Sequence, residues 1–243
     1  MEAGLSTKPA LSAETRRGIL AWIAKAIFGM GFFALLLLPQ VPAGRWDWVW
    51  GWVFLGLFAL ATVANVLILL RVNPELLASR SRGLHEPGAK RWDKIVTSIG
   101  VGILPLAGWV VAALDLRFGW TAGMPLWLHL TGVAGFILGW IVVLWATAAN
   151  RFFSTTVQLH QGQTVQTGGP YRYVRHPGYA GALIYQFATV FVLGSWLAMI
   201  PMVAAVPFLV LRTAREDRML QTQLAGYRDY ASQVRYRLLP RVW

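Results

Sequence analysis

Long apolar runs, separated by shorter polar segments, dominate the chain from residue 18 onward. Mostly apolar runs of about twenty residues or more occupy positions 18–38, 46–70, 95–114 and 126–149, and each is long enough to cross a bilayer as a helix. A further apolar region, 179–211, is interrupted at Gly194-Ser195 and predicts two short helices in a hairpin. The pattern predicts an all-α integral membrane protein with about six membrane helices, the last two forming the hairpin.

Polar segments lie between and after these runs. Segment 71–94 carries six Lys/Arg residues and is expected to hold a short surface helix at 74–81. Segment 150–178 is longer than a structureless loop usually is, which indicates a functional loop. The tail 212–243 is polar, and its opening is expected to continue the last helix out of the membrane. Pro105 predicts a kink in the third span.

We expect a single membrane domain over residues 1–243. Residues 1–149 would supply four membrane spans, and residues 150–243 would supply a long polar loop, the helical hairpin and a polar helical tail.

Composition agrees with a membrane protein. The chain is 56% hydrophobic and 13% charged, which is too apolar for an ordinary soluble domain. Its thirteen tryptophans include many near the predicted membrane boundaries, as in an aromatic belt. The chain has no cysteine, which excludes disulfides, thiolate metal sites and a cysteine nucleophile, and we expect no metal site.

The net charge is +12, and the basic residues lie at the ends of the apolar spans, which is typical of membrane orientation rather than of a nucleic-acid-binding surface. Of the 22 Lys/Arg residues, 19 fall on one side if the N-terminus is cytoplasmic and the hairpin returns, with Arg45 and Arg117 on the other side. The positive-inside rule then places both termini, segment 150–178 and the tail in the cytoplasm of a multi-pass protein of the inner or cell membrane. We expect membrane lipids as neighbours, and neither nucleic acid nor an obligate protein partner.

Candidate chemistry begins in the stretch 168–181, which reads GGPYRYVRHPGYAG. Its glycines and prolines turn the backbone sharply, while arginines, tyrosines and His176 crowd the same span. Pro177 suits the first turn of a new helix. A cationic loop that merely caps a membrane helix would look similar.

A second cluster, Arg212 to Arg218, lies where the last helix is expected to leave the membrane. Arg212 and Glu216 are four residues apart and so share a helix face. Ionisable groups near membrane depth are functional candidates, although an interfacial ion pair could also simply end the helix. A ligand with an ammonium group, a carboxylate and an aromatic base would match both clusters, and S-adenosylmethionine is such a ligand. Neither a Gly-x-Gly-x-x-Gly turn after a strand nor a Walker loop is present.

The stretch 169–181 resembles the signature of isoprenylcysteine carboxyl methyltransferases, which are related to phospholipid methyltransferases. In the tail, Arg212-x-x-x-Glu216-Asp217-x-x-Leu220 resembles the family's Arg-x-x-x-Glu-Glu-x-x-Leu, and Gly226-Tyr227-x-x-Tyr230 resembles its closing element. The resemblance covers about residues 158–240, and the first three spans match only in character. Asp217 departs from the family, which usually has a second glutamate there.

The resemblance implies packed membrane helices with S-adenosylmethionine in a cytosol-facing pocket, and an enzyme that transfers its methyl group to a lipophilic acceptor from the bilayer. It implies that the loop at the start of residues 150–243 binds the cofactor and that the helical tail is catalytic, with Arg212 as the contact of the acceptor. The cofactor contacts that it implies are Gln158, Gln163, Thr164, Val165, Gln166, Tyr171, His176, Pro177, Gly178, Tyr179 and Glu216.

The acceptor follows from charge. A carboxylate is a nucleophile at neutral pH and needs only a cation to hold it, which Arg212 could supply through a forked hydrogen bond. This favours an isoprenylcysteine-like or other isoprenoid or lipid acid. Phospholipid N-methylation, for which His160 could act as a base, stays open. So does an NADPH-dependent reductase, because sterol reductases share Arg-His-Pro-x-Tyr and a similar C-terminal ending. A lipid-binding or scaffold protein would leave the paired clusters unexplained.

Overall fold

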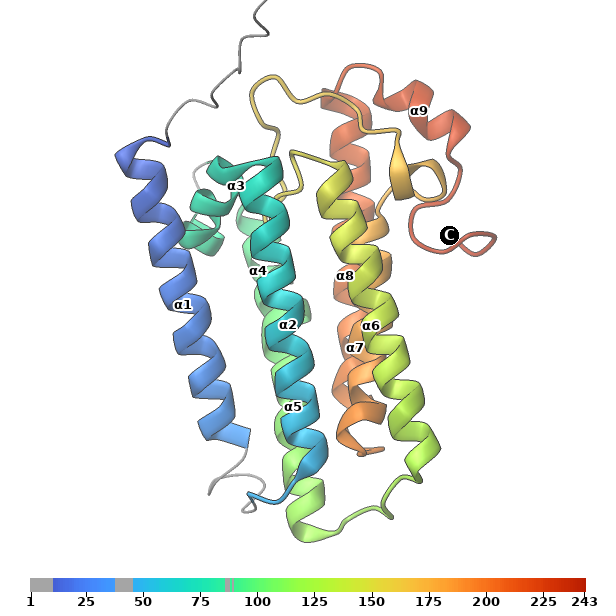
Figure 1. Ribbon diagram of the computed structural model, residues 1–243. Coiled ribbons are helices and arrows are strands. Elements are labelled where there is room, and N and C mark those ends of the chain that lie inside the picture. The colour runs from blue at the N-terminus through green and yellow to red at the C-terminus, as the bar shows by residue number, and fades with distance from the viewer. Residues whose placement is uncertain (1–10, 38–45, 86–87, 89) are drawn as a thin grey trace, which may run out of the picture.

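The computed structural model describes residues 11–37, 46–85, 88 and 90–243, and every regular element in this part of the chain is helical. The long helices run side by side as one bundle, with α3, α9 and the end of the chain gathered at one end (Figure 1). This confirms the predicted all-α class. The helices are α1 (Ala13–Leu37), α2 (Val49–Val72), α3 (Pro74–Ser79), α4 (Arg91–Thr97), α5 (Leu104–Phe118), α6 (Leu126–Ala149), α7 (Pro177–Leu193), α8 (Met199–Gln223) and α9 (Tyr227–Gln233).

Three helical rods in the described residues are long and apolar enough to cross a membrane: Val49–Val72, Arg91–Phe118 and Leu126–Ala149. The apolar helix α7 is shorter, at 17 residues, and α8 carries its charged cluster in its second half. The chain is an integral membrane protein. The expected last residue of the first span, Leu38, and the far-side Arg45 lie outside the described residues.

The predicted boundaries agree closely for α6 and differ most for the third span. That span begins at Arg91 rather than at residue 95, because α4 adds a turn that buries Asp93 completely. Its irregularity is a π-helical segment, Ser98–Ile103, just before Pro105. A proline has no N–H to offer the carbonyl four residues earlier, so the ladder loosens ahead of Pro105, which itself lies in the first turn of α5.

The short helix expected at 74–81 forms as α3 and is followed by a 3₁₀ segment, Arg80–His85. Asn73 caps α3, since its side chain accepts a hydrogen bond from the Leu76 N–H at 3.1 Å, and Pro74 occupies the first turn. The Asn73 side chain also donates to the Arg151 carbonyl at 2.8 Å, which ties α3 to the loop that follows α6.

Helices α6 and α7 pack through glycines. A side-chain carbon at Gly139 would lie 2.5 Å from the backbone nitrogen of Tyr185, and one at Gly132 would lie 2.5 Å from that of Val192. Small residues at such spacing let two membrane helices approach until their backbones touch. The register of α7 against α6 is therefore fixed, and the loop that joins these two helices must fold at one end of the bundle.

The hairpin between α7 and α8 forms at the predicted break. Gly194 ends α7 in the left-handed region, with φ 78°, and the Ser195 hydroxyl donates to Asp115 on α5 at 2.6 Å. The chain then returns in α8, which runs without interruption past Arg212 to Gln223, as predicted. The start of α7 and the charged half of α8 consequently lie at the same end of the bundle (Figure 1).

Candidate active site

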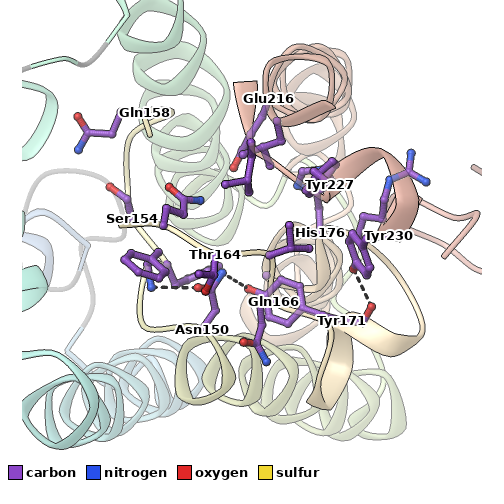
Figure 2. Close-up of a pocket in the computed structure, with 18 of the residues that line it drawn as sticks. Asn150, Ser154, Gln158, Thr164, Gln166, Tyr171, His176, Glu216, Tyr227 and Tyr230 are labelled. Atoms are coloured by element: carbon purple, nitrogen blue, oxygen red, sulfur yellow. Dashed lines mark hydrogen bonds between the residues drawn. The ribbon is translucent and has the colours of Figure 1, made fainter. Parts of the chain in front are cut away.

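A pocket lies where the loop after α6, the start of α7, the charged half of α8 and α9 meet (Figure 2). Its volume is about 80 Å³. Ligand pockets are usually about 300 Å³ or more, so a nucleoside-sized ligand requires the loop side chains to move outward. The lining residues are Asn150, Phe152, Phe153, Ser154, Thr156, Gln158, Gln163, Thr164, Val165, Gln166, Tyr171, Arg175, His176, Gly178, Tyr179, Glu216, Leu220, Leu224, Tyr227 and Tyr230.

The double glycine at 168–169 seats the loop on the end of α6. Gly169 has φ 60°, and a side-chain carbon there would lie 3.1 Å from Ala149 and 3.2 Å from the indole nitrogen of Trp145. Only glycine accepts this conformation readily at so close an approach. The 3₁₀ turn Gly169–Arg172 follows and buries Tyr171.

Tyr171 forms one wall of the pocket and is held at both ends. Its hydroxyl accepts a hydrogen bond from the Asn150 amide at 3.2 Å, and its carbonyl accepts one from the Tyr230 hydroxyl at 2.7 Å. Burial raises the pKa of the Tyr171 hydroxyl, so the side chain stays neutral. The wall is thus a fixed, uncharged aromatic face (Figure 2).

The Arg-His-Pro segment is clamped to the end of the chain. The Arg175 and His176 N–H groups donate to the carbonyls of Tyr236 and Arg237, each at 2.9 Å. Pro177 then begins α7. Gly178 contacts the ring of Phe153 so closely that any side chain there would displace the ring. The tail therefore sets the position of the His176 side chain from behind.

Asp217 is the fully buried centre of this clamp. It accepts two hydrogen bonds from Arg175, at 2.7 and 2.9 Å, and one from Arg237 at 2.9 Å. Tyr227, Gln221 and His176 also contact it, at 3.1, 2.8 and 3.3 Å. Burial by itself raises the pKa of the Asp217 carboxyl. The hydrogen bonds from His176 and Arg175 lower it by a larger amount, so the pKa lies well below its usual range. Asp217 does not line the pocket; it supports the residues that do.

Glu216, the neighbour of Asp217, points the other way, into the pocket (Figure 2). It is the only carboxylate among the described residues that line this pocket. The Tyr179 hydroxyl donates to it at 2.5 Å, and the Tyr179 ring lies parallel to the His176 ring with centroids 5.8 Å apart. One turn of α7 and one turn of α8 thus present a carboxylate and two stacked rings to the same space.

Arg212 lies beside the pocket rather than in its lining. Its guanidinium donates to Asp93 at 2.8 Å and to the Thr155 carbonyl at 2.6 Å. The guanidinium carbon, Cζ, lies 5.1 Å from the centre of the Tyr179 ring. Asp93 also accepts the Val157 N–H at 2.8 Å. This buried pair joins α4, α8 and the loop, and places one cation directly behind Tyr179 and Glu216.

The structure brings most of the sequence-predicted residues together. Of the predicted cofactor contacts, all except Pro177 line the pocket, and Pro177 starts the helix that carries Gly178 and Tyr179. Sequence reasoning did not identify Asp93, which follows Trp92 in a segment without any motif. It also missed the lining residues at 150–156. The polar side chains of Asn150, Ser154 and Thr156, next to the end of an apolar run, were the available signal.

The chemistry of the lining suits S-adenosylmethionine. The Glu216 carboxylate can bind an ammonium group, and the amides of Asn150, Gln158, Gln163 and Gln166 offer donors and acceptors for a carboxylate and a ribose. The tyrosine and histidine rings offer faces for an aromatic base. The types of side chain that line the pocket therefore fit S-adenosylmethionine, the cofactor that the motifs imply.

Comparison with known proteins agrees with the motifs. Residues 130–222 match the model of the isoprenylcysteine carboxyl methyltransferase (ICMT) family. This confirms the family resemblance for the part of the chain that holds the Arg-His-Pro stretch and the Arg212–Leu220 motif. No protein of curated function matches. Among solved structures, the chain is similar to the eukaryotic intramembrane Ras methyltransferase ICMT, solved without a monobody, with 17% identity over 92% of this chain and 96% of that chain and a TM-score of 0.43. A similarity of that size carries no further conclusion.

Proposed function

We propose that this chain, which over residues 130–222 belongs to the isoprenylcysteine carboxyl methyltransferase family, is an S-adenosylmethionine-dependent membrane methyltransferase. Its acceptor is the carboxylate of a lipophilic acid, such as an isoprenylcysteine or another isoprenoid or lipid acid. The observation that carries the proposal is the convergence of the two motifs on one pocket, with Glu216 from α8 facing His176 and Tyr179 from α7.

S-adenosylmethionine, when bound, supplies a methyl group already activated on a sulfonium. The chain's own residues then have to bind, orient and exclude water. In this proposal Glu216 binds the ammonium group, the amide side chains of 158–166 bind the polar edges, and Tyr171 and His176 flank the base. Asp217 has no contact with the ligand and holds Arg175 and His176 in place.

The acceptor needs a cation rather than a base, because a carboxylate is deprotonated at neutral pH. Arg212 is our candidate for this role, since it is always charged and its forked donors match a carboxylate. Asp93 and Thr155 hold its guanidinium against the Tyr179 ring, at the edge of the pocket. Arg212 can therefore contact an acceptor that approaches from the side of α4 and the loop.

The membrane orientation belongs to the same proposal. The pocket, the loop and the tail lie at one end of the bundle, at which the basic residues also concentrate, so we place this end in the cytoplasm. The chain then acts as one domain, with its first four spans in the bilayer and its cofactor pocket at the cytoplasmic surface. The acceptor reaches the pocket from the bilayer.

The experiment measures the transfer of tritiated methyl from S-adenosylmethionine by the purified protein in nanodiscs. The acceptors are a farnesylated cysteine with a free carboxylate and, separately, phosphatidylethanolamine. Base hydrolysis of an ester releases the label as methanol, whereas an N-methyl group stays on the lipid. We expect base-labile label on the acid, lost in Glu216→Ala and kept in Glu75→Ala, whose side chain is exposed and does not line the pocket.

Base-stable label on phosphatidylethanolamine alone would replace the carboxyl reaction with phospholipid N-methylation. No label on either acceptor, together with oxidation of NADPH by a sterol substrate, would replace it with a reductase.

A further inference from the structure

A second cavity, of about 350 Å³, lies between α1, α2 and α6, outside the pocket described above. Its walls are mostly apolar and include Trp22, Ala26, Gly29, Met30 and Phe58. Lys25, Asn65, Arg80 and Trp140 add its polar groups. The volume falls in the range of small-molecule sites, and we refer to this cavity as the α1–α2–α6 groove.

Arg80 is a half-buried cation whose acceptors, within the described part of the chain, are neutral. Its guanidinium donates to the Asn65 side-chain oxygen at 2.7 Å and to the Phe153 carbonyl at 3.2 Å. Its Nε is buried, and no described residue accepts a hydrogen bond from it. Burial lowers the pKa of Arg80 to about 10, so the group remains protonated at neutral pH. A partly desolvated charge of this kind is stabilised by an anion.

Two further residues that line the groove carry donors. The indole N–H of Trp140 is buried, and no described residue accepts a hydrogen bond from it. Lys25 extends from α1 to the Ser81 carbonyl, at 2.6 Å, and brings a second positive charge to the groove. Native structures leave few buried donors unsatisfied, and each such donor calls for a specific partner.

The groove adjoins the cofactor pocket through one loop segment. Phe153 accepts the hydrogen bond from Arg80, lines the cofactor pocket and covers Gly178. Two residues later, the Thr155 carbonyl accepts the hydrogen bond from Arg212. Residues two apart are separated by at most roughly 7 Å along the chain. Arg80 and Arg212 therefore donate to carbonyl groups two residues apart in the same loop.

We propose that the α1–α2–α6 groove binds the methyl acceptor, a single-chain amphiphile with a carboxylate head, and that Arg80 and Lys25 bind its head while the apolar walls hold its tail. The occupant follows from charge complementarity, because two cations and the buried indole N–H of Trp140 belong to residues that line a groove with otherwise mostly apolar walls. The assignment of this ligand as methyl acceptor rests on the proposed function. Arg80 would hold the carboxylate beside Phe153 before the reaction, and the head would then pass along this loop segment to Arg212, the cation proposed to hold it during methyl transfer.

The glycines of α1 provide a matched pair of probes. A side-chain carbon at Gly29 or at Gly31 would meet nothing within 4 Å, so neither site is crowded. Gly29 lines the groove and Gly31 does not. Gly29→Leu should fill the groove, while Gly31→Leu makes the same chemical change elsewhere on the helix. Arg80→Gln removes the half-buried cation, and Arg71→Gln is its exposed control.

The experiment measures equilibrium binding of tritiated N-acetyl-S-farnesylcysteine, and of its methyl ester, to the full chain in phosphatidylcholine nanodiscs. S-adenosylhomocysteine binding is measured on the same samples. We expect the wild type to bind the acid about tenfold more tightly than the ester, and Arg80→Gln to remove this preference. Gly29→Leu should weaken the binding of both compounds about tenfold, and the two controls should stay within about twofold.

Equal binding of the acid by Gly29→Leu and Gly31→Leu would overturn the proposal, and so would an unchanged acid preference in Arg80→Gln. If Arg80→Gln does not fold, the Gly29/Gly31 pair still decides. An anionic phospholipid that co-purifies with the wild type, is lost in Arg80→Gln and is not displaced by the acid would overturn the proposal by identifying a structural lipid. Acid binding without any S-adenosylhomocysteine binding would refute the proposed methyltransferase, while the groove would still be a site for this amphiphile.

Discussion

Replacement of Asp217 by asparagine tests whether the tail clamps the active-site loop. Asp217 is fully buried and accepts hydrogen bonds from Arg175, Arg237, Gln221 and Tyr227. The substitution Asp217→Asn would keep the shape of the side chain but remove its charge, and the new NH₂ group would face donors. The guanidinium of Arg175, itself buried, would lose its bidentate partner.

Removing one partner of a buried ion pair typically costs about 3–5 kcal/mol, because the other charge is left uncompensated. The side chain of Arg237 is partly exposed and can relax toward water, which places the expected loss near the lower end of that range. For a chain of this size a loss of about 3 kcal/mol lowers the melting temperature by roughly 6–12 °C. The affinity for S-adenosylhomocysteine should fall as well, since Arg175 and His176 lose their support.

The assay is thermal unfolding of the detergent-purified protein at pH 7 and one fixed scan rate, with and without S-adenosylhomocysteine. Asp229→Asn is the matched control: it makes the same change in net charge at an exposed position on α9. We expect Asp229→Asn to unfold within about 2 °C of the wild type, since exposed substitutions usually change stability by less than about 0.5 kcal/mol. If Asp217→Asn unfolds within the same margin, the clamp does not have the energetic role that its geometry implies.

Other buried groups and close contacts give three further predictions. Folding lowers the pKa of the Asp217 carboxyl, so its contribution to stability is complete above the unfolded pKa of about 4 and is lost as the pH falls below that value. The difference in melting temperature between wild type and Asp217→Asn should therefore shrink from about pH 6 to about pH 3. A constant difference would contradict this prediction. Asp93→Asn should destabilise the protein by about 3–5 kcal/mol, whereas Asp93→Leu combined with Arg212→Met should recover much of the loss in a thermal melt; additive losses would refute a coupled pair. Gly139→Val should lower the melting temperature, because the side chain would meet the backbone of Tyr185, while Gly56→Val, with nothing within 4 Å, should not; equal effects would argue against close α6–α7 packing.

The helical frame could be predicted from the sequence because hydrophobic length is a strong signal in a membrane protein. The span 126–149 agrees with α6 to the residue, and the hairpin break at Gly194 followed from one glycine between apolar runs. The start of the third span was not predictable from hydropathy, because α4 is polar and is placed by its packing on α8. Its buried Asp93 meets Arg212, 119 residues away, and no local pattern marks such a pair.

The candidate site could be anticipated only in part. The Arg-His-Pro stretch and the Arg212–Glu216 pair stood out because charged and turn-forming residues are rare next to apolar spans. The sequence does not show that Glu216 lines the pocket while Asp217 is buried behind it. Adjacent positions of a helix face different neighbours, and those neighbours are known only once α8 is packed in the fold. Arg80 looked like one basic residue among six in a polar loop, and its partial burial depends on α1 and α2 packing around it.

The most direct test of the central claim is a thermal-stability titration of the purified protein with S-adenosylhomocysteine and, separately, with NADPH. A ligand that binds only the folded state, at about a hundred times its Kd, stabilises the protein by about 2.7 kcal/mol. We predict a concentration-dependent rise in melting temperature with S-adenosylhomocysteine, lost in His176→Ala and Glu216→Ala and kept in Glu75→Ala. A rise with NADPH alone, or an S-adenosylhomocysteine response that Glu216→Ala leaves intact, would contradict the proposed cofactor pocket.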